Sequence, residues 1–185
     1  MHRRPLLGLL DSYEPFRAED AAARDRIRNF VEARPDCFER SLLEGHVTGS
    51  AWILDGTRRR CLLTHHRKLD RWLQLGGHAD GQADVLAVAI REAEEESGLR
   101  SLRLVRASIF DCDVHLIPAR KQEPDHWHYD VRFLLEADAG EALVISEESK
   151  ELAWLDLGDV ASLGTDVSVL RMVERTRSLF PGPAS

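Results

Sequence analysis

Hydrophobic side chains recur at helical spacing in the first part of the chain. The pattern predicts a helix that ends before Pro35, because proline cannot continue an α-helix. A shorter helix is predicted over residues 6–10, and Glu14-Pro15 separates the two. The apolar residues that share one side of the longer helix are Ala23, Ile27, Phe30 and Val31.

From Thr48 onward the pattern becomes that of strands. Residues 51–54 and 61–64 are short apolar runs, and Asp55-Gly56 between them is a strong signal for a hairpin turn. The later strand-like segments cover residues 102–117, 127–135 and 151–156, with a polar turn at 118–124.

Two further helices are predicted in this second part of the chain. Residues 84–97 carry the clearest helical pattern, and a C-terminal helix should follow Thr165 and end at Pro181-Gly182. The expected buried stripe of the C-terminal helix consists of Val169, Met172, Val173, Thr176 and Phe180.

The helix predicted over residues 84–97 combines an apolar stripe with a cluster of carboxylates. Glu95 and Glu96 lie within about 60° of Glu92 on a helical wheel, whereas Glu94 points away. Three like charges so close together destabilise a helix by roughly 0.2–0.5 kcal/mol per pair. A hard divalent cation would remove that repulsion, and oxygen ligands favour Mg²⁺ or Mn²⁺ over zinc. The alternative is a solvated acidic face. The apolar stripe is Leu86, Ala89, Ile90, Ala93 and Ser97.

The sequence around this helix resembles the Nudix box over residues 77–99. The box consists of a glycine, a glutamate six residues later, and then Arg-Glu-x-x-Glu-Glu-x-Gly followed by an aliphatic residue. One defining position departs from it, because Ala83 stands where the family has its first glutamate. Asp80 and Asp84 flank this position as candidate substitutes, although Asp84 is also a good helix N-cap. The matching positions are Gly77, Arg91, Glu92, Glu95, Glu96 and Gly98.

The resemblance implies an α/β fold, the Nudix α/β/α sandwich with a mixed sheet. It extends from about residue 46 to 180, which suggests a Nudix domain over 46–185 and a helical extension over 1–45. The extension is a candidate cap, lid or homodimer contact, and the sequence does not choose among them.

The resemblance also implies the activity and the site. The expected activity is divalent-metal-dependent hydrolysis of a phosphoanhydride bond in a nucleoside-diphosphate-linked or similar diphosphate substrate, by attack of water at phosphorus. Mg²⁺ or Mn²⁺ would be held by Glu92, Glu95 and Glu96, with the backbone carbonyl of Gly76 completing the shell. Arg91 would orient the carboxylates. The sequence carries no signature for coenzyme A, ADP-ribose, diadenosine polyphosphate or capped RNA as the substrate.

A second group of polar residues is predicted on one face of a later strand. His126, His128 and Asp130 alternate with apolar neighbours, so they share a face. We expect this face to contact substrate, with a second metal site or an ordinary polar face as the alternatives. Arg67, in a basic loop before the glycines, is a candidate ligand for phosphate. Glu147, Glu148 and Glu151 are candidates for the general base.

Composition and charge narrow the function classes. With 43% hydrophobic and 31% charged residues the chain resembles an ordinary globular protein, and its net charge of −7 argues against general nucleic-acid binding. No apolar stretch is long enough for a membrane span. The three cysteines are widely spaced, as in a protein with reduced thiols, so a cytoplasmic location is expected.

Two other function classes stay open at this point. One is a nucleotide-sensing or regulatory module with a weakened metal site, which Ala83 keeps open. The other is an isomerase of isoprenoid diphosphates, which needs a catalytic cysteine; Cys61 and Cys112 lie in no recognisable motif.

Overall fold

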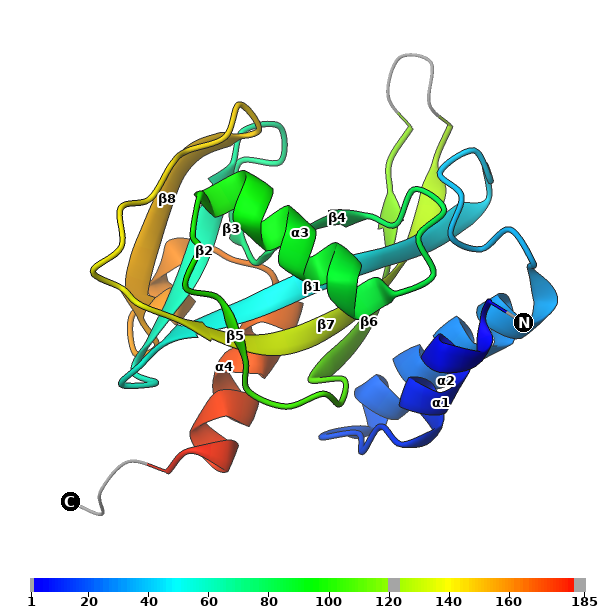
Figure 1. Cartoon of the computed structure of the whole chain (residues 1–185), viewed down its shortest axis with the longest axis horizontal. Coiled ribbons are helices and arrows are strands. Elements are labelled where there is room, and N and C mark those ends of the chain that lie inside the picture. The colour runs from blue at the N-terminus through cyan, green and yellow to red at the C-terminus, as the bar shows by residue number, and fades with distance from the viewer. Residues whose placement is uncertain (1, 120–123, 182–185) are drawn as a thin grey trace. The chain divides into compact units, whose positions relative to one another are not determined.

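The computed structural model describes residues 2–119 and 124–181, and within them helices and strands alternate as in an α/β protein (Figure 1). The helices are α1 (Arg4–Asp11), α2 (Ala18–Ala33), α3 (Val85–Ser97) and α4 (Val167–Leu179), with a 3-10 helix, η1, at Val160–Leu163. The strands are β1 (Gly45–Asp55), β2 (Arg60–His66), β3 (Arg71–Leu73), β4 (Leu75–His78), β5 (Arg103–Leu104), β6 (Asp111–Ile117), β7 (His126–Ala137) and β8 (Ser149–Asp156).

The chain divides into two compact units, and β1, α3 and β7 each run from one into the other. The first unit comprises the described parts of Met1–Ser50, Gly76–Glu92 and Arg106–Phe133. The second comprises the described parts of Ala51–Leu75, Ala93–Val105 and Leu134–Ser185.

In the first unit, the two N-terminal helices share a core with the strands. α1 and α2 lie side by side (Figure 1), and the ring of Phe30 on α2 stacks on Tyr129 of β7 at 3.8 Å between centroids. The Asp20 carboxylate accepts hydrogen bonds from the backbone N–H groups of Phe16 and Arg17 and thereby stabilises the start of α2. The shared core includes Leu6, Leu10, Ile27, Phe30, Val31, Val47, Val88, Cys112, Val131 and Phe133.

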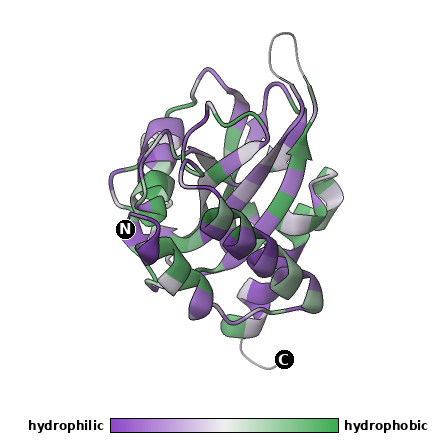
Figure 2. Ribbon diagram, turned by 90° about the vertical axis from the view of Figure 1, so that its right-hand side faces the viewer, coloured by the Kyte–Doolittle hydropathy of each residue, from purple (hydrophilic) through white to green (hydrophobic). Residues whose placement is uncertain are grey.

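Strand pairing in the first unit sets which side chains are neighbours. β6 and β7 are antiparallel, with Asp111 opposite Arg132 at one end and Ile117 opposite His126 at the other. Hydrophobic and hydrophilic positions alternate along the strands, as Figure 2 shows by colour. Consequently His126, His128 and Asp130 point to one side of β7, as the sequence predicts.

In the second unit, β2 is the central strand. It pairs with the end of β1, with β3 and with β8, all antiparallel. The turn between β1 and β2 is held by the carboxylate of Asp55, which accepts hydrogen bonds from the backbone N–H groups of Arg59 and Arg60. Asp166 caps the start of α4, and the Trp52 indole of β1 donates a hydrogen bond to Thr176 on that helix.

Most predicted elements are confirmed, including the helix over 84–97 and the hairpin at Asp55-Gly56. The strand predicted over 102–117 is wrong, because the chain leaves the sheet between β5 and β6. The backbone N–H of Val105 bonds to Leu134 and that of Phe110 to Arg132, so residues 106–109 span only one residue of β7 and must loop out. Part of the turn predicted at 118–124 lies outside the described residues. Within the described ranges no helix has the length and apolar character needed to cross a membrane.

Candidate functional site

Helix α3 carries the three carboxylates that the sequence singled out. Its start is capped by Asp84, whose side chain accepts a hydrogen bond from the Ala87 backbone N–H at 3.1 Å. Glu92, Glu95 and Glu96 occupy the i, i+3 and i+4 positions, next to the buried stripe of the helix. Glu95 is exposed, and the other two are half-buried. The fully buried residues of the helix are Val85, Val88, Ala89, Ala93 and Ser97.

The Glu92 carboxylate lies directly against the backbone of Gly77. A Cβ atom at residue 77 would collide with the carboxylate in this position, so the side chain of Glu92 would have to move. Arg91 pairs with Glu92 at 2.8 Å and donates a second hydrogen bond to the backbone carbonyl of His78 at 3.0 Å. Arg91 therefore holds both the Glu92 carboxylate and the end of β4.

Gly76 allows the close approach of β4 to β1. Its φ of 155° lies at the edge of the region that other residues avoid, and a Cβ there would come within 2.6 Å of the Ser50 Cα. Together the two glycines set β4 between β1 and the start of the carboxylate face.

Ala83 lies just before α3, partly buried against the apolar core of the first unit. The neighbouring Asp84 uses its carboxylate as the helix cap, and Asp80 is exposed with a positive φ of 47°. The local structure therefore gives Asp84 a role as the helix cap, and the metal role predicted for Asp80 or Asp84 stays a prediction.

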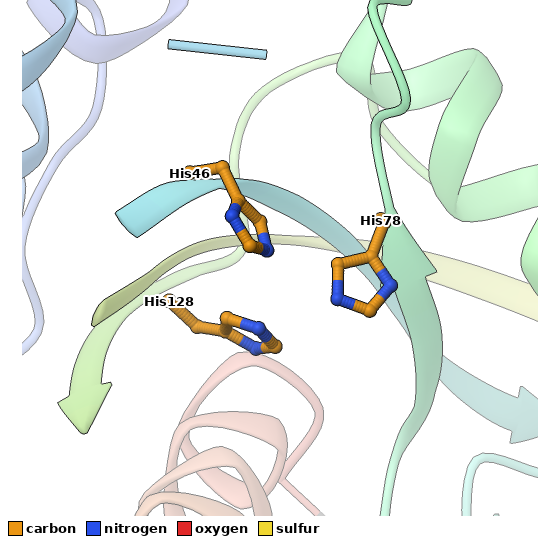
Figure 3. Close-up of side chains that lie close together, drawn as sticks. All are labelled: His46, His78 and His128. Carbon is orange, nitrogen blue, oxygen red and sulfur yellow. The ribbon is translucent and has the colours of Figure 1, made fainter. Parts of the chain in front are cut away.

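A cluster of imidazoles lies at the end of β4. His46 of β1, His78 of β4 and His128 of β7 converge so that one nitrogen of each lies within 4.8 Å of the others (Figure 3). The ring centroids of His46 and His128 are 5.0 Å apart, and the ring of His126 lies 5.1 Å from that of His46. Burial lowers the pKa of His78 to about 4 and of His128 to about 2, and neighbouring charges add to both shifts. These rings are therefore neutral at physiological pH.

Gly45 brings two of these histidines together. A Cβ at residue 45 would come within 2.9 Å of the Trp127 Cβ, and the Trp127 backbone N–H bonds to the carbonyl of Glu44 at 3.0 Å. This close approach of β1 to β7 sets His46 beside the histidines of β7.

Asp130, on the same face of β7, lies in the interior of the first unit. It is only 2% exposed, and its carboxylate accepts hydrogen bonds from Thr48, Ser50 and Arg132. Its role is internal, because these bonds neutralise a buried charge. The substrate contact predicted for His126, His128 and Asp130 stays a prediction.

Arg67 lies in the second unit and bonds to backbone carbonyls. Its guanidinium donates to the carbonyls of Glu147 at 3.0 Å and Ser149 at 2.8 Å, and its N–H donates to that of Glu148. Arg67 therefore fixes the segment that leads into β8, which contains two of the candidate bases.

A hollow of about 730 Å³ in the second unit contains none of the predicted site residues. It is lined by polar and charged residues that include Asp55, Arg60, Arg100 and Arg103. The predicted site residues on α3 and β7 therefore lie outside this hollow.

Sequence reasoning missed His46 and treated His78 only as part of the approach to the box. The three converging histidines are separated by 31 and 49 intervening residues, so no local motif marks them. Only a correct pairing of β1, β4 and β7 would have revealed the cluster.

The chain matches the model of the NUDIX domain family over residues 45–176. It is 36% identical over 117 residues to a protein named putative 8-oxo-dGTP diphosphatase 3 from Mycobacterium tuberculosis; the match covers 59% of this chain and 49% of the relative. The chain thus spans about half the length of the curated relatives it matches.

Solved structures show the same fold at low identity. An Ap4A hydrolase binary complex from C. elegans matches with a TM-score of 0.58 and 16% identity, over 72% of this chain and 96% of the other. A Nudix hydrolase from M. smegmatis matches with a TM-score of 0.55 and 19% identity, over 76% and 91% of the two chains.

Proposed function

Because this chain belongs to the Nudix family, we propose that it hydrolyses a phosphoanhydride bond in a nucleotide or nucleoside-diphosphate-linked substrate, using a divalent metal ion held by α3. The reaction is attack of water at phosphorus with departure of a phosphate group.

The observation that carries the proposal is the position of the Glu92 carboxylate. It lies in the space that the missing Cβ of Gly77 leaves and is paired with Arg91. A half-buried carboxylate held in this way is more specific than the solvated acidic face that the sequence left open. Glu95 and Glu96, one turn further along α3, add two more carboxylates to the same side of the helix.

The donor set suits Mg²⁺ or Mn²⁺. Glu92, Glu95 and Glu96 offer oxygen atoms only, which these hard cations prefer over nitrogen or sulfur. The cation, when bound, polarises the phosphoryl oxygens, lowers the pKa of water and neutralises charge on the leaving phosphate. The Gly76 carbonyl is a further candidate ligand, since β4 runs beside the start of this face.

Other residues position this site. Arg91 holds Glu92 in place through its ion pair and links it to β4 through the His78 carbonyl, so the carboxylate is oriented before a metal arrives. Asp84 fixes the start of the helix. Glu147, Glu148 and Glu151 remain candidates for the base that takes a proton from water.

The names of the relatives and the net charge of the chain support a nucleotide as the substrate. Both named relatives act on nucleotides by their names, one on 8-oxo-dGTP and one on Ap4A. A chain of net charge −7 needs cations to accept a polyphosphate, which is consistent with a metal-dependent site.

A substrate screen tests this proposal. Purified protein is incubated with 8-oxo-dGTP, dGTP, Ap4A, ADP-ribose and coenzyme A, each with Mg²⁺, with Mn²⁺ and with EDTA, and products are separated by ion-exchange chromatography. We expect divalent-dependent cleavage of at least one of them between phosphorus atoms. Cleavage that persists in EDTA would contradict the proposed metal-dependent chemistry.

The second candidate, a regulatory nucleotide-binding module, is favoured by one observation. Ala83 packs against apolar neighbours where a carboxylate would otherwise stand. Tight nucleotide binding without turnover of any member of the panel would favour this module over the hydrolase. The isomerase is disfavoured, because burial raises the pKa of Cys61 to about 12 and that of Cys112 well above its usual value.

A further inference from the structure

Three histidines from distant parts of the sequence converge in the first unit. His46 lies at the start of β1, His78 at the end of β4 and His128 on β7. One ring nitrogen of each lies within 4.8 Å of the other two, and Figure 3 shows the three rings turned toward a common point.

Buried imidazole nitrogens in this cluster lack a hydrogen bond of normal geometry to any described residue. His46 is only 3% exposed, and within the described residues neither of its ring nitrogens makes a hydrogen bond of normal geometry, although the backbone of Leu42 interacts with the ring. The Nε2 atom of His128 is likewise buried and unpaired within the described part of the chain. Buried polar atoms are nearly always satisfied in folded proteins, so these rings point to a ligand that accepts one lone pair from each imidazole.

The spacing suits a metal ion. In a tetrahedral zinc site with nitrogen ligands at about 2.0–2.1 Å, the nitrogens stand about 3.4 Å apart. The separations of up to 4.8 Å in the cluster therefore need side-chain movements of only about 1 Å to close around an ion.

The chemistry of the donors selects the metal. All three ligands are neutral imidazoles, which suit Zn²⁺ and its transition-metal neighbours and are poor ligands for Mg²⁺. Three protein ligands leave a fourth position open, as in zinc sites that bind water or a substrate oxygen.

We propose that His46, His78 and His128 bind one transition-metal ion of the Zn²⁺ class, at a site separate from the carboxylates of α3. The two sites share a connection through β4: the carbonyl of His78 accepts the hydrogen bond of Arg91, which in turn pairs with Glu92. His78 also directly follows Gly77, against which that carboxylate rests. A bound ion would hold this end of β4 in place beside α3.

The test is metal binding by the full chain after removal of metals with a chelator. Titration with ZnCl₂, followed by calorimetry, should show one tight site that survives a large excess of Mg²⁺. Titration with Co²⁺ should give the visible absorption of a four-coordinate nitrogen site. Failure of the folded protein to take up one equivalent of either ion would overturn the proposal.

Single variants assign the ligands. His46→Ala, His78→Ala and His128→Ala should each weaken Zn²⁺ binding by at least about 100-fold. His2→Ala is the matched control, because it also removes one imidazole but from an exposed position outside the cluster; it should bind as tightly as the unaltered protein. Retained affinity in all three cluster variants would contradict the assignment.

Two further measurements guard against misfolded variants and against confusion with the proposed hydrolase site. In the unaltered protein, Zn²⁺ should shift the ¹⁵N resonances of His46, His78 and His128 and leave those of His2 and His66 in place. Glu96→Gln should bind Zn²⁺ normally even if it is inactive, which separates this site from the carboxylates of α3. Unshifted cluster resonances at saturating Zn²⁺, or loss of Zn²⁺ binding in Glu96→Gln, would overturn the proposal.

Discussion

At the scale of single residues, Arg132 is a buried cation of the first unit, only 1% exposed. It is ion-paired with Asp130 at 2.7 Å, Asp111 at 3.0 Å and Asp113 at 3.3 Å. Burial disfavours its charge, but attraction to Asp113, Asp130 and Asp111 outweighs that effect and raises the pKa of the guanidinium. Arg132 is thus the cation that allows the neighbouring carboxylates to be buried, and Asp130 in turn holds Thr48 and Ser50 of β1.

Arg132→Met should therefore lower the free energy of unfolding by about 3–5 kcal/mol, because it leaves buried carboxylates without their partner. Urea denaturation measures the change. Arg103→Met is the control: Arg103 pairs with Glu136 but its side chain is 73% exposed, so its loss should change stability by about 1 kcal/mol or less. A loss below about 1 kcal/mol for Arg132→Met would contradict the account of this network.

The three cysteines give a second prediction at this scale. All are buried and free, and burial raises the pKa of Cys37 to about 11 and that of Cys61 to about 12. A raised pKa keeps a thiol protonated at pH 8, and the thiol is a poor nucleophile. The folded protein should react slowly with DTNB at pH 8 and release three equivalents at once in guanidinium. Fast reaction of one native thiol would contradict this and reopen the isomerase.

The carboxylates could be predicted from the sequence at this scale and the histidines could not. Glu92, Glu95 and Glu96 lie within five residues on one helix, so helical periodicity alone puts them on one side. His46 and His78 come together with His128 only through the pairing of strands, which a single sequence does not specify.

At the scale of secondary-structure elements, α3 connects the fold to the proposed chemistry. Asp84 caps its start, and the three carboxylates lie next to its buried stripe. The position before it, Ala83, packs against the apolar core and contributes no charge. We therefore expect the site to bind its metal ion more weakly than it would with a carboxylate at residue 83.

Ala83→Glu should restore the missing carboxylate and lower the Mg²⁺ concentration needed for half-maximal turnover on the order of tenfold, equivalent to about 1.4 kcal/mol. Activity measured across a Mg²⁺ titration tests this. Ala83→Gln is the control of equal size without charge and should not lower that concentration. An equal effect of both variants would mean that size, not charge, matters at this position.

Elements with a strong local pattern were predicted well. The helix at 84–97 has both a periodic apolar stripe and a cap. The Asp55-Gly56 dipeptide strongly favours a hairpin turn. The break between β5 and β6 was not predicted. Residues 106–109 loop out because β7 has only one residue opposite these four. The composition of residues 102–117 does not indicate how many residues of a partner strand can pair with them.

At the scale of the whole molecule, the family model and the structural units divide the chain differently. The NUDIX match begins at residue 45, yet the core of the first unit joins α1 and α2 with residues of β1, α3, β6 and β7. The predicted division into a helical extension over 1–45 and a Nudix domain over 46–185 therefore stays a prediction. Within the first unit, the N-terminal helices are part of the packing that supports the strands of the histidine cluster.

The central claim is that the carboxylate face of α3 performs divalent-dependent hydrolysis. The most direct test compares turnover of the best substrate by Glu96→Gln and Glu94→Gln, two identical changes two residues apart on one helix. Glu96 lies on the proposed metal face and Glu94 points away from it, so Glu96→Gln should lose at least about 100-fold in turnover at saturating Mg²⁺, whereas Glu94→Gln should stay within about twofold of the unaltered protein. Equal turnover by the two variants, with both folded, would contradict the account.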